Sequence, residues 1–127
     1  MSLVKVLLVD DEATFVNALA EHLKGCGYDV AVAFDGAQAI RALKEEQPAL
    51  ALVDLKLPGM NGEEFIRQAK QLSPQTQVVV LTAYHDEGLK EAALRQAGAV
   101  GYLYKPLKSL LDLERQIEAL LRSPPRS

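Results

Sequence analysis

The sequence predicts an α/β domain built on a single five-stranded parallel sheet, doubly wound in a (βα)5 arrangement. Two features of the 127-residue chain lead to this prediction. Five short apolar runs recur along it, and a stretch with helical character follows each of them. Most of the runs are apolar throughout rather than alternating with polar residues, which is typical of strands covered on both faces. Strands that alternate with helices favour a parallel sheet with right-handed crossovers.

The apolar runs give the expected strands. They cover Val4–Val9, Val30–Ala33, Leu50–Val53, Val78–Leu81 and Val100–Tyr104. In a doubly wound sheet, ligands bind beyond the carboxyl ends of the strands. The residues that follow each run are therefore the first candidates for a functional site.

The first two expected helices begin and end at recognisable residues. The sequence Gly25-Cys26-Gly27 supplies a stop for the first helix. The second is expected to start at Asp35, a residue type that caps helix N-termini, and Pro48 follows its end. The residues expected to face the sheet are Phe15, Leu19, Leu23, Ala37, Ile40 and Leu43.

Three further helices complete the pattern. Asn61 lies three residues before Glu64, as in a capping box, and predicts the start of the third helix. The fourth is expected at about Asp86–Ala97, ending at Gly98. The residues expected to face inward from the third and fifth helices are Phe65, Leu72, Leu110, Leu113, Ile117, Leu120 and Leu121.

Composition places the chain among ordinary soluble domains. Hydrophobic residues make up 49% and charged residues 24%, and the net charge of −3 gives no basic footprint for nucleic acid. Cys26 is the only cysteine, which excludes a disulfide within the chain. No apolar run approaches the roughly 18 residues of a membrane span, and the opening residues lack the features of a secretory leader. We therefore expect a cytoplasmic domain over residues 1–122, with 123–127 as a tail or the start of a linker, and no contact with nucleic acid or membrane.

Charged and polar residues collect where the expected strands end. Asp10 and Asp11 follow the first strand, Asp54 the third, Thr82 the fourth and Lys105 the fifth. Parallel strands end on one side of a sheet, so a single pocket can hold three carboxylates, a hydroxyl and an ammonium group. Two like charges about 4 Å apart repel by around 4 kcal/mol at an effective dielectric near 20. Three carboxylates with one lysine carry a net charge of −2, so they could retain a proton or bind a divalent cation, and hard oxygen ligands suit Mg²⁺.

Such a pocket has the parts for phosphoryl transfer. Asp54 is the best candidate nucleophile because it stands alone on the middle strand, whereas Asp10 and Asp11 are paired for metal. An aspartate that attacks phosphorus gives an aspartyl-phosphate. The transfer requires positive charge on the phosphoryl oxygens more than elaborate acid–base chemistry, and Mg²⁺ and Lys105 would supply it. Thr82 would donate a hydrogen bond to the bound group.

Four motifs, in order and at compatible spacing, resemble the receiver domain of bacterial two-component response regulators. They are "LLVDDEA", "ALVDLKLPGMNGEEF", "VVLTAY" and "GAVGYLYKPL". Together they are spread over nearly the whole chain. Each motif alone is a weak pattern, but the four in sequence are specific. The resemblance implies the flavodoxin-like strand order 2-1-3-4-5.

The resemblance also assigns roles to residues. Asp54 would accept the phosphoryl group, and Thr82 with Tyr102 would form the switch. The implied Mg²⁺ ligands are Asp10, Asp11, Asp54 and the backbone carbonyl of Lys56, with Mn²⁺ as a possible substitute for Mg²⁺. The residues implied to contact the phosphoryl group are Thr82 and Lys105, and those of the site loop are Ala83 and Pro106. Glu12 is interpreted only as a helix-start residue.

The implied partner is a sensor histidine kinase or a phosphotransfer protein. A surface of the fourth helix, fifth strand and fifth helix would bind a partner or form a homodimer. The domain would not be an enzyme but a phosphoacceptor that assists its own phosphorylation and dephosphorylation.

Three alternative functions fit the sequence less well. A small Mg²⁺-dependent phosphohydrolase with an aspartate nucleophile would use similar groups, but such enzymes place Asp-x-Asp after a strand, and this chain has Asp10-Asp11-Glu12. A flavin-binding module would need a Ser/Thr/Gly-rich phosphate loop after the first strand, which the sequence lacks. A receiver that signals without phosphate would not need the full set of acids that this chain carries.

Overall fold

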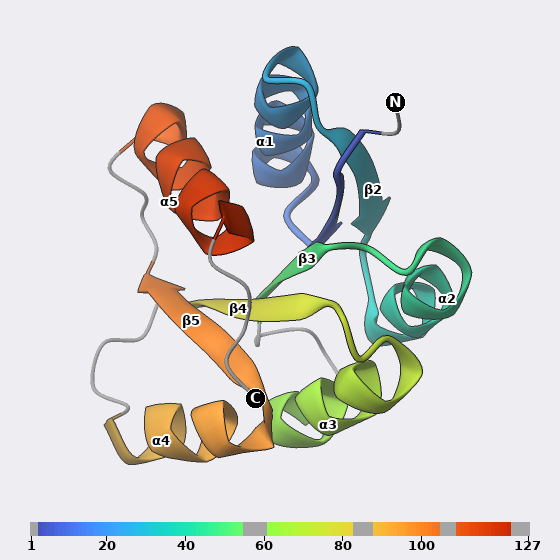
Figure 1. Ribbon diagram of the computed structural model, residues 1–127, viewed down its shortest axis with the longest axis vertical. Coiled ribbons are helices and arrows are strands. Elements are labelled where there is room, and N and C mark those ends of the chain that lie inside the picture. The colour runs from blue at the N-terminus through green and yellow to red at the C-terminus, as the bar shows by residue number, and fades with distance from the viewer. Residues whose placement is uncertain (1–2, 55–60, 83–87, 105–108, 123–127) are drawn as a thin grey trace.

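The computed structural model describes residues 3–54, 61–82, 88–104 and 109–122. Five parallel strands form one sheet in the order β2-β1-β3-β4-β5, with helices on both of its faces (Figure 1). The predicted fold class and strand order are both confirmed.

Strands and helices alternate along the described chain. The strands are β1 (Lys5–Val9), β2 (Asp29–Ala33), β3 (Leu50–Asp54), β4 (Gln77–Thr82) and β5 (Ala99–Tyr104). The helices are α1 (Ala13–Gly25), α2 (Gly36–Glu46), α3 (Gly62–Leu72), α4 (Gly88–Ala97) and α5 (Leu110–Arg122). Each predicted strand end lies within one residue of the observed one.

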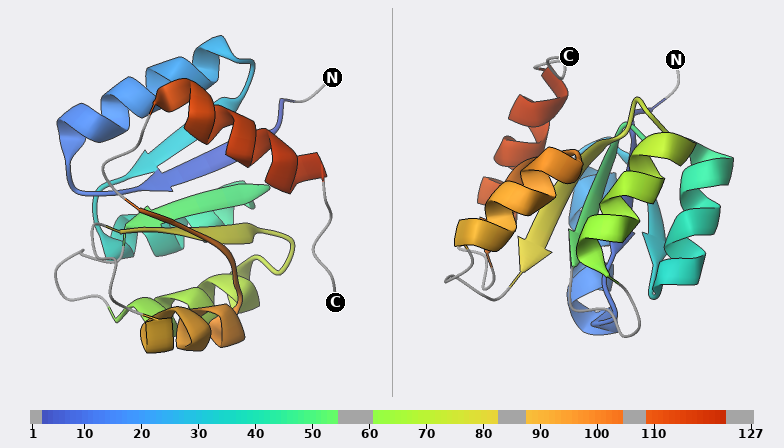
Figure 2. Two further views of the ribbon diagram at one scale, coloured as in Figure 1. Left: turned by 90° about the vertical axis from the view of Figure 1, so that its left-hand side faces the viewer. Right: turned by 90° about the horizontal axis from the view of Figure 1, so that it is seen from below.

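The sheet is buried on both faces, which explains why its strands are apolar throughout. Along β1, Leu7 and Val9 belong to a core with residues of α2, α3 and α4. Val6 and Leu8 belong to a second core with residues of α1 and α5. Figure 2, left, shows these layers, with α1 and α5 on one side of the sheet and α3 and α4 on the other. Because alternate side chains of a strand point to opposite faces, both sets must be apolar.

Two predicted helix starts are confirmed in atomic detail. The side chain of Asp35 accepts a 2.8 Å hydrogen bond from the backbone N–H of Gln38. The side chain of Asn61 likewise accepts from the N–H of Glu64, at 3.1 Å. Each bond satisfies one of the N–H groups that a helix N-terminus leaves without an internal partner.

The inner face of α2 differs from the prediction at one residue. Ala37 is exposed, whereas Ala39 is fully buried with Leu43. Residues four apart share one face of a helix, so Leu43 places Ala39 against the sheet. Ala37 is two positions away from Ala39 and therefore lies on nearly the opposite side. Ala37 lies three residues before the half-buried Ile40, whereas Ala39 lies four residues before the fully buried Leu43.

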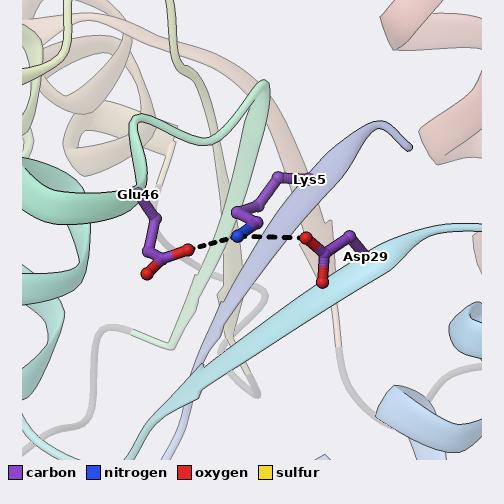
Figure 3. Close-up of polar contacts among 3 residues, drawn as sticks. All are labelled: Lys5, Asp29 and Glu46. Atoms are coloured by element: carbon purple, nitrogen blue, oxygen red, sulfur yellow. Dashed lines mark hydrogen bonds and ion pairs between the residues drawn. The ribbon is translucent and has the colours of Figure 1, made fainter. Parts of the chain in front are cut away.

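A group of ion pairs lies where the strands begin, at the end of the sheet opposite their carboxyl ends. Lys5 Nζ lies 3.0 Å from Oδ2 of Asp29 and also pairs with Oε1 of Glu46 (Figure 3). One ammonium group thus joins the start of β1 to the start of β2 and to the last residue of α2. None of these three residues was singled out from the sequence, because the partners are far apart along the chain.

Candidate functional site

Asp10 and Asp54 come together at the carboxyl ends of two neighbouring strands. β1 pairs with β3 in parallel, with Val9 beside Val53, so the residue after each of them stands at the same edge. Both carboxyl-bearing residues are buried, with exposed fractions of 3% for Asp10 and 4% for Asp54. Burial of a carboxylate is costly unless other groups compensate its charge. Two buried aspartates at the ends of neighbouring strands therefore indicate a functional site.

The backbone around Asp10 fixes the direction of its side chain. Its N–H donates a 3.1 Å hydrogen bond to the carbonyl oxygen of Ala33, at the end of β2. Its Oδ1 accepts a 3.0 Å bond from the N–H of Glu12. The residue is thus held at the turn where β1 passes into α1.

Glu12 contributes a third carboxylate to the same place. It is the N-cap residue of α1, as its interpretation as a helix-start residue predicted, but its side chain makes no capping hydrogen bond. One carboxylate oxygen from each of Asp10, Glu12 and Asp54 lies within 4.8 Å of the other two. Sequence reasoning missed this role. Three acids in a row were visible, but the direction in which the third one points was not.

Asp11 does not belong to this group of carboxylates. It is exposed on the turn before α1. Among the residues that the structure describes, the group of three carboxylates consists of Asp10, Glu12 and Asp54. The assignment of Asp11 to the metal stays a prediction.

The predicted switch residues lie on the next two strands. β4 pairs with β3 so that Leu81 stands beside Asp54, which places Thr82 one position further at the same edge. On the other side, Thr82 pairs with Tyr104 and Val80 with Tyr102. Tyr102 is half-buried and packs against the core on the α2, α3 and α4 side of the sheet.

Four predicted site residues lie outside the described residues. They are Lys56, Ala83, Lys105 and Pro106. The described part of the site therefore consists of the carboxylate cluster and the strand positions of Thr82 and Tyr102.

The donor set of the cluster fits a hard divalent cation. Mg²⁺ binds oxygen ligands at about 2.0–2.1 Å in octahedral geometry, which separates two ligand oxygens by about 3.0 Å when adjacent and about 4.2 Å when opposite. The mutual spacing of the three carboxylate oxygens, within 4.8 Å, is close to that range. A dication would also offset the repulsion among three negative charges held near one another.

No helix in the described ranges is both long and apolar enough to cross a membrane.

Comparison with known proteins agrees with the motifs. The sequence profile of the family described as "Response regulator receiver domain" matches residues 6–118. Over 118 residues the chain is 36% identical to the alkaline phosphatase synthesis transcriptional regulatory protein PhoP of Bacillus subtilis, covering 93% of this chain and 48% of PhoP. Over the same length it is 40% identical to the DNA-binding response regulator MtrA of Mycobacterium tuberculosis, covering 93% of this chain and 50% of MtrA. The chain thus spans about half the length of the curated relatives it matches.

Solved structures give the same result. A CheY-like response regulator receiver domain protein from Methanospirillum hungatei superposes with a TM-score of 0.88 at 30% identity, covering 95% of each chain. A response regulator from Burkholderia pseudomallei, solved with a phosphorylated aspartic acid, a calcium ion and citrate, has a TM-score of 0.79 at 28% identity, covering 95% of this chain and 75% of its own. The receiver domain of a Pseudomonas aeruginosa sensor histidine kinase, with magnesium coordinated in its active-site cleft, has a TM-score of 0.82 at 27% identity, covering 96% of this chain and 100% of its own.

The profile match covers most of the chain, and the fold, the strand order and the acidic cluster at the strand ends all agree with it. The chain therefore belongs to the response regulator receiver domain family of two-component signalling.

Proposed function

We propose that Asp54 is the phosphoacceptor of this receiver domain. The observation that carries the proposal is the burial of Asp54 at the end of the central strand β3, within 4.8 Å of the carboxylate oxygens of Asp10 and Glu12. An isolated aspartate at a strand end would ordinarily be solvated. A buried one beside two further acids favours the binding of positive charge, and phosphoryl transfer uses that charge.

In the proposed reaction, a carboxylate oxygen of Asp54 attacks the phosphorus of a phosphohistidine or of a small acyl phosphate. The new O–P bond forms as the bond from phosphorus to the donor's nitrogen or oxygen breaks, and the donor leaves with that electron pair. The domain would not turn over a separate substrate but would assist its own phosphorylation and the later hydrolysis of the aspartyl-phosphate.

The residues proposed to hold Mg²⁺ are Asp10, Asp11, Asp54 and the backbone carbonyl of Lys56. When bound, the cation supplies positive charge to the phosphoryl oxygens. Lys105 and the hydroxyl of Thr82 would contact the same group, and Ala83 and Pro106 would shape the loops around it. The described carboxylate cluster supports the assignment of Asp10 and Asp54. The calcium ion in the response regulator of Burkholderia pseudomallei and the magnesium ion in the receiver domain of Pseudomonas aeruginosa support a divalent cation.

The proposed output is a change on the surface of α4, β5 and α5. Thr82 would move toward the phosphoryl group, and Tyr102 would follow. The half-buried position of Tyr102 supports this step, because its ring packs against a core that includes Leu94 of α4. β5 is one of the two edge strands of the sheet, so a change there can reach the surface directly.

The proposed phosphodonor is a sensor histidine kinase or a phosphotransfer protein in the cytoplasm. Residues 1–122 would form the receiver unit, with 123–127 as a tail or the start of a linker. The surface of α4, β5 and α5 would serve a partner or a second copy of the domain, without contact of this chain with nucleic acid or membrane.

Acetyl phosphate with Mg²⁺ tests the phosphoacceptor. We expect intact-protein mass spectrometry to detect one added phosphoryl group on the wild type and none on Asp54→Ala. Asp112→Ala, which removes an exposed aspartate from α5, is the matched control and should be labelled like the wild type. Full labelling of Asp54→Ala would contradict the assignment. Rapid multiple-turnover hydrolysis of a small phosphate ester would instead favour the phosphohydrolase.

A further inference from the structure

The side chain of Glu12 is directed to the strand-end cluster rather than to the helix that it begins. An N-cap side chain ordinarily accepts a hydrogen bond from an N–H two or three residues further on. Glu12 has the extended backbone of an N-cap, with φ −84° and ψ 92°, but makes no such bond. Its carboxylate instead has an oxygen within 4.8 Å of oxygens of Asp10 and Asp54.

Hydrogen bonds hold both the N–H and the carbonyl group of Glu12, so its main chain is fixed next to the carboxylate cluster. Its N–H donates to Oδ1 of Asp10 at 3.0 Å, and its carbonyl oxygen accepts from the N–H of Val16 at 3.0 Å. The first bond links Glu12 to the buried acid, and the second is the first hydrogen bond of α1. The Cβ of Glu12 is therefore anchored beside the cluster.

A carboxylate in this position acts on whatever cation the cluster binds. Mg²⁺ retains several waters when only a few protein oxygens are available, so a further carboxylate either replaces a water or accepts a hydrogen bond from one. Both arrangements strengthen binding. Glu12 is exposed, whereas Asp10 and Asp54 are buried, so solvent weakens its contribution relative to theirs.

We propose that Glu12 is a carboxylate partner of the divalent cation, together with Asp10 and Asp54, and that its charge sets how tightly the site binds that cation. The inference rests on the proposed metal-dependent phosphoacceptor function. It adds a residue that the four sequence motifs do not assign to the metal.

The test measures metal affinity directly, without phosphorylation. Mn²⁺ would be titrated into the metal-free domain and free Mn²⁺ read from its electron paramagnetic resonance signal, with Mg²⁺ affinity obtained by competition. We expect Glu12→Gln to weaken both affinities by about tenfold, the low end for residues that support a metal site. Glu12→Asp retains the charge on a shorter side chain and should recover part of the loss.

Glu21→Gln is the matched control. It removes the same charge from an exposed glutamate on the same helix, and its affinities should equal those of the wild type. Thermal melting of each metal-free variant checks that the fold is intact, which we expect because the Glu12 side chain makes no capping bond. Equal affinities for Glu12→Gln and the wild type would overturn the inference. Equal weakening in Glu12→Gln and Glu21→Gln would also overturn it, since the effect would then be one of net charge.

Failure of the proposed function would give a different result from failure of the role of Glu12. A wild type that neither binds Mn²⁺ nor accepts phosphate from acetyl phosphate would overturn both proposals. A wild type that does both, with unchanged affinity in Glu12→Gln, would overturn only the role of Glu12.

Discussion

The side-chain amide of Gln47 donates a 3.0 Å hydrogen bond to the carbonyl oxygen of Leu72, which joins the C-terminal end of α2 to that of α3. The same amide nitrogen also donates to the carbonyl of Leu43 at 3.0 Å, and its Oε1 accepts from the hydroxyl of Ser73 at 3.2 Å. Gln47 does this from a left-handed backbone conformation, with φ 46° and ψ 59°. A conformation that non-glycine residues rarely adopt is thus compensated by the bonds that it makes possible.

Replacement of Gln47 by alanine should destabilise the domain by about 1–2 kcal/mol, because several hydrogen bonds are lost and the left-handed backbone remains. Gln47→Gly loses the same bonds but relieves the backbone, so it should be more stable than Gln47→Ala by about 1 kcal/mol. Urea denaturation of the three proteins measures both differences. If Gln47→Ala proved at least as stable as Gln47→Gly, the left-handed backbone at this position would not be strained.

Gly98 should not tolerate a side chain. Its φ is +131°, and a Cβ there would lie 2.7 Å from Cγ of Lys70. We expect Gly98→Ala to destabilise the domain by about 2–3 kcal/mol, through a disfavoured backbone and displacement of the Lys70 stem. Urea denaturation checks the loss.

The two causes at Gly98 are separable. In a Lys70→Ala background the close contact is gone, so Gly98→Ala should cost less there, while the backbone part of the cost remains. Gly25→Ala is the control, since nothing lies within 4 Å of a Cβ at this helical position. It should leave stability unchanged or raise it by up to about 1 kcal/mol. An equal cost of Gly98→Ala in both backgrounds would remove the contact from the explanation.

Whether a feature was predictable from the sequence depends on how far apart along the chain the interacting residues lie. The caps at Asp35 and Asn61 were predictable because each residue bonds to an N–H three positions away. The strands were predictable because burial on both faces leaves a run of apolar residues. The left-handed Gln47 was not, since its bonds reach Leu72 and Ser73, which lie 25 and 26 residues further along the chain.

The candidate site shows the same division. Parallel topology brings Asp10 and Asp54 together, so their proximity followed from the strand assignment alone. The participation of Glu12 depends on which way one side chain turns at a helix start, and neither spacing nor residue type determines that. The motif roles of Lys56 and Lys105 lie outside the described residues and stay predictions.

The ion pairs of Lys5 should stabilise the domain in a pH-dependent way. Hydrogen bonds to Glu46 and then to Asp29 raise the pKa of the Lys5 ammonium above its ordinary value of 10.5. A base whose pKa is higher in the folded state contributes stability below its unfolded pKa, and the contribution is lost as pH rises through the folded one. Lys5→Met should therefore have a lower melting temperature than the wild type from neutral pH to about pH 10, with the gap closing above that.

Two comparisons complete this test. Lys24→Met, an exposed lysine of α1, should show little change at any pH. Added salt should narrow the gap between Lys5→Met and the wild type, because these groups are partly exposed and solvent ions screen them. A gap that stays constant through pH 11 would assign the stabilisation to packing of the lysine stem instead.

The acidic cluster should weaken the metal-free domain and strengthen the metal-bound one. Asp10→Asn removes one buried charge but retains the oxygen that accepts the N–H bond from Glu12. Without divalent metal, we expect this variant to be more stable than the wild type by about 1 kcal/mol, because fewer like charges repel within the cluster. Asp112→Asn on α5 is the control and should show no gain.

With saturating Mg²⁺, the wild type should instead be more stable than Asp10→Asn. A ligand that binds only the folded state stabilises it by about 2.7 kcal/mol at a concentration one hundred times its Kd. The wild type should gain this stability, whereas Asp10→Asn should gain much less at the same Mg²⁺ concentration. Thermal melting with and without Mg²⁺ gives all four values. A wild type that is the more stable protein in the absence of metal would mean that other groups already compensate the charge on Asp10, and that the cluster does not depend on a cation for its stability.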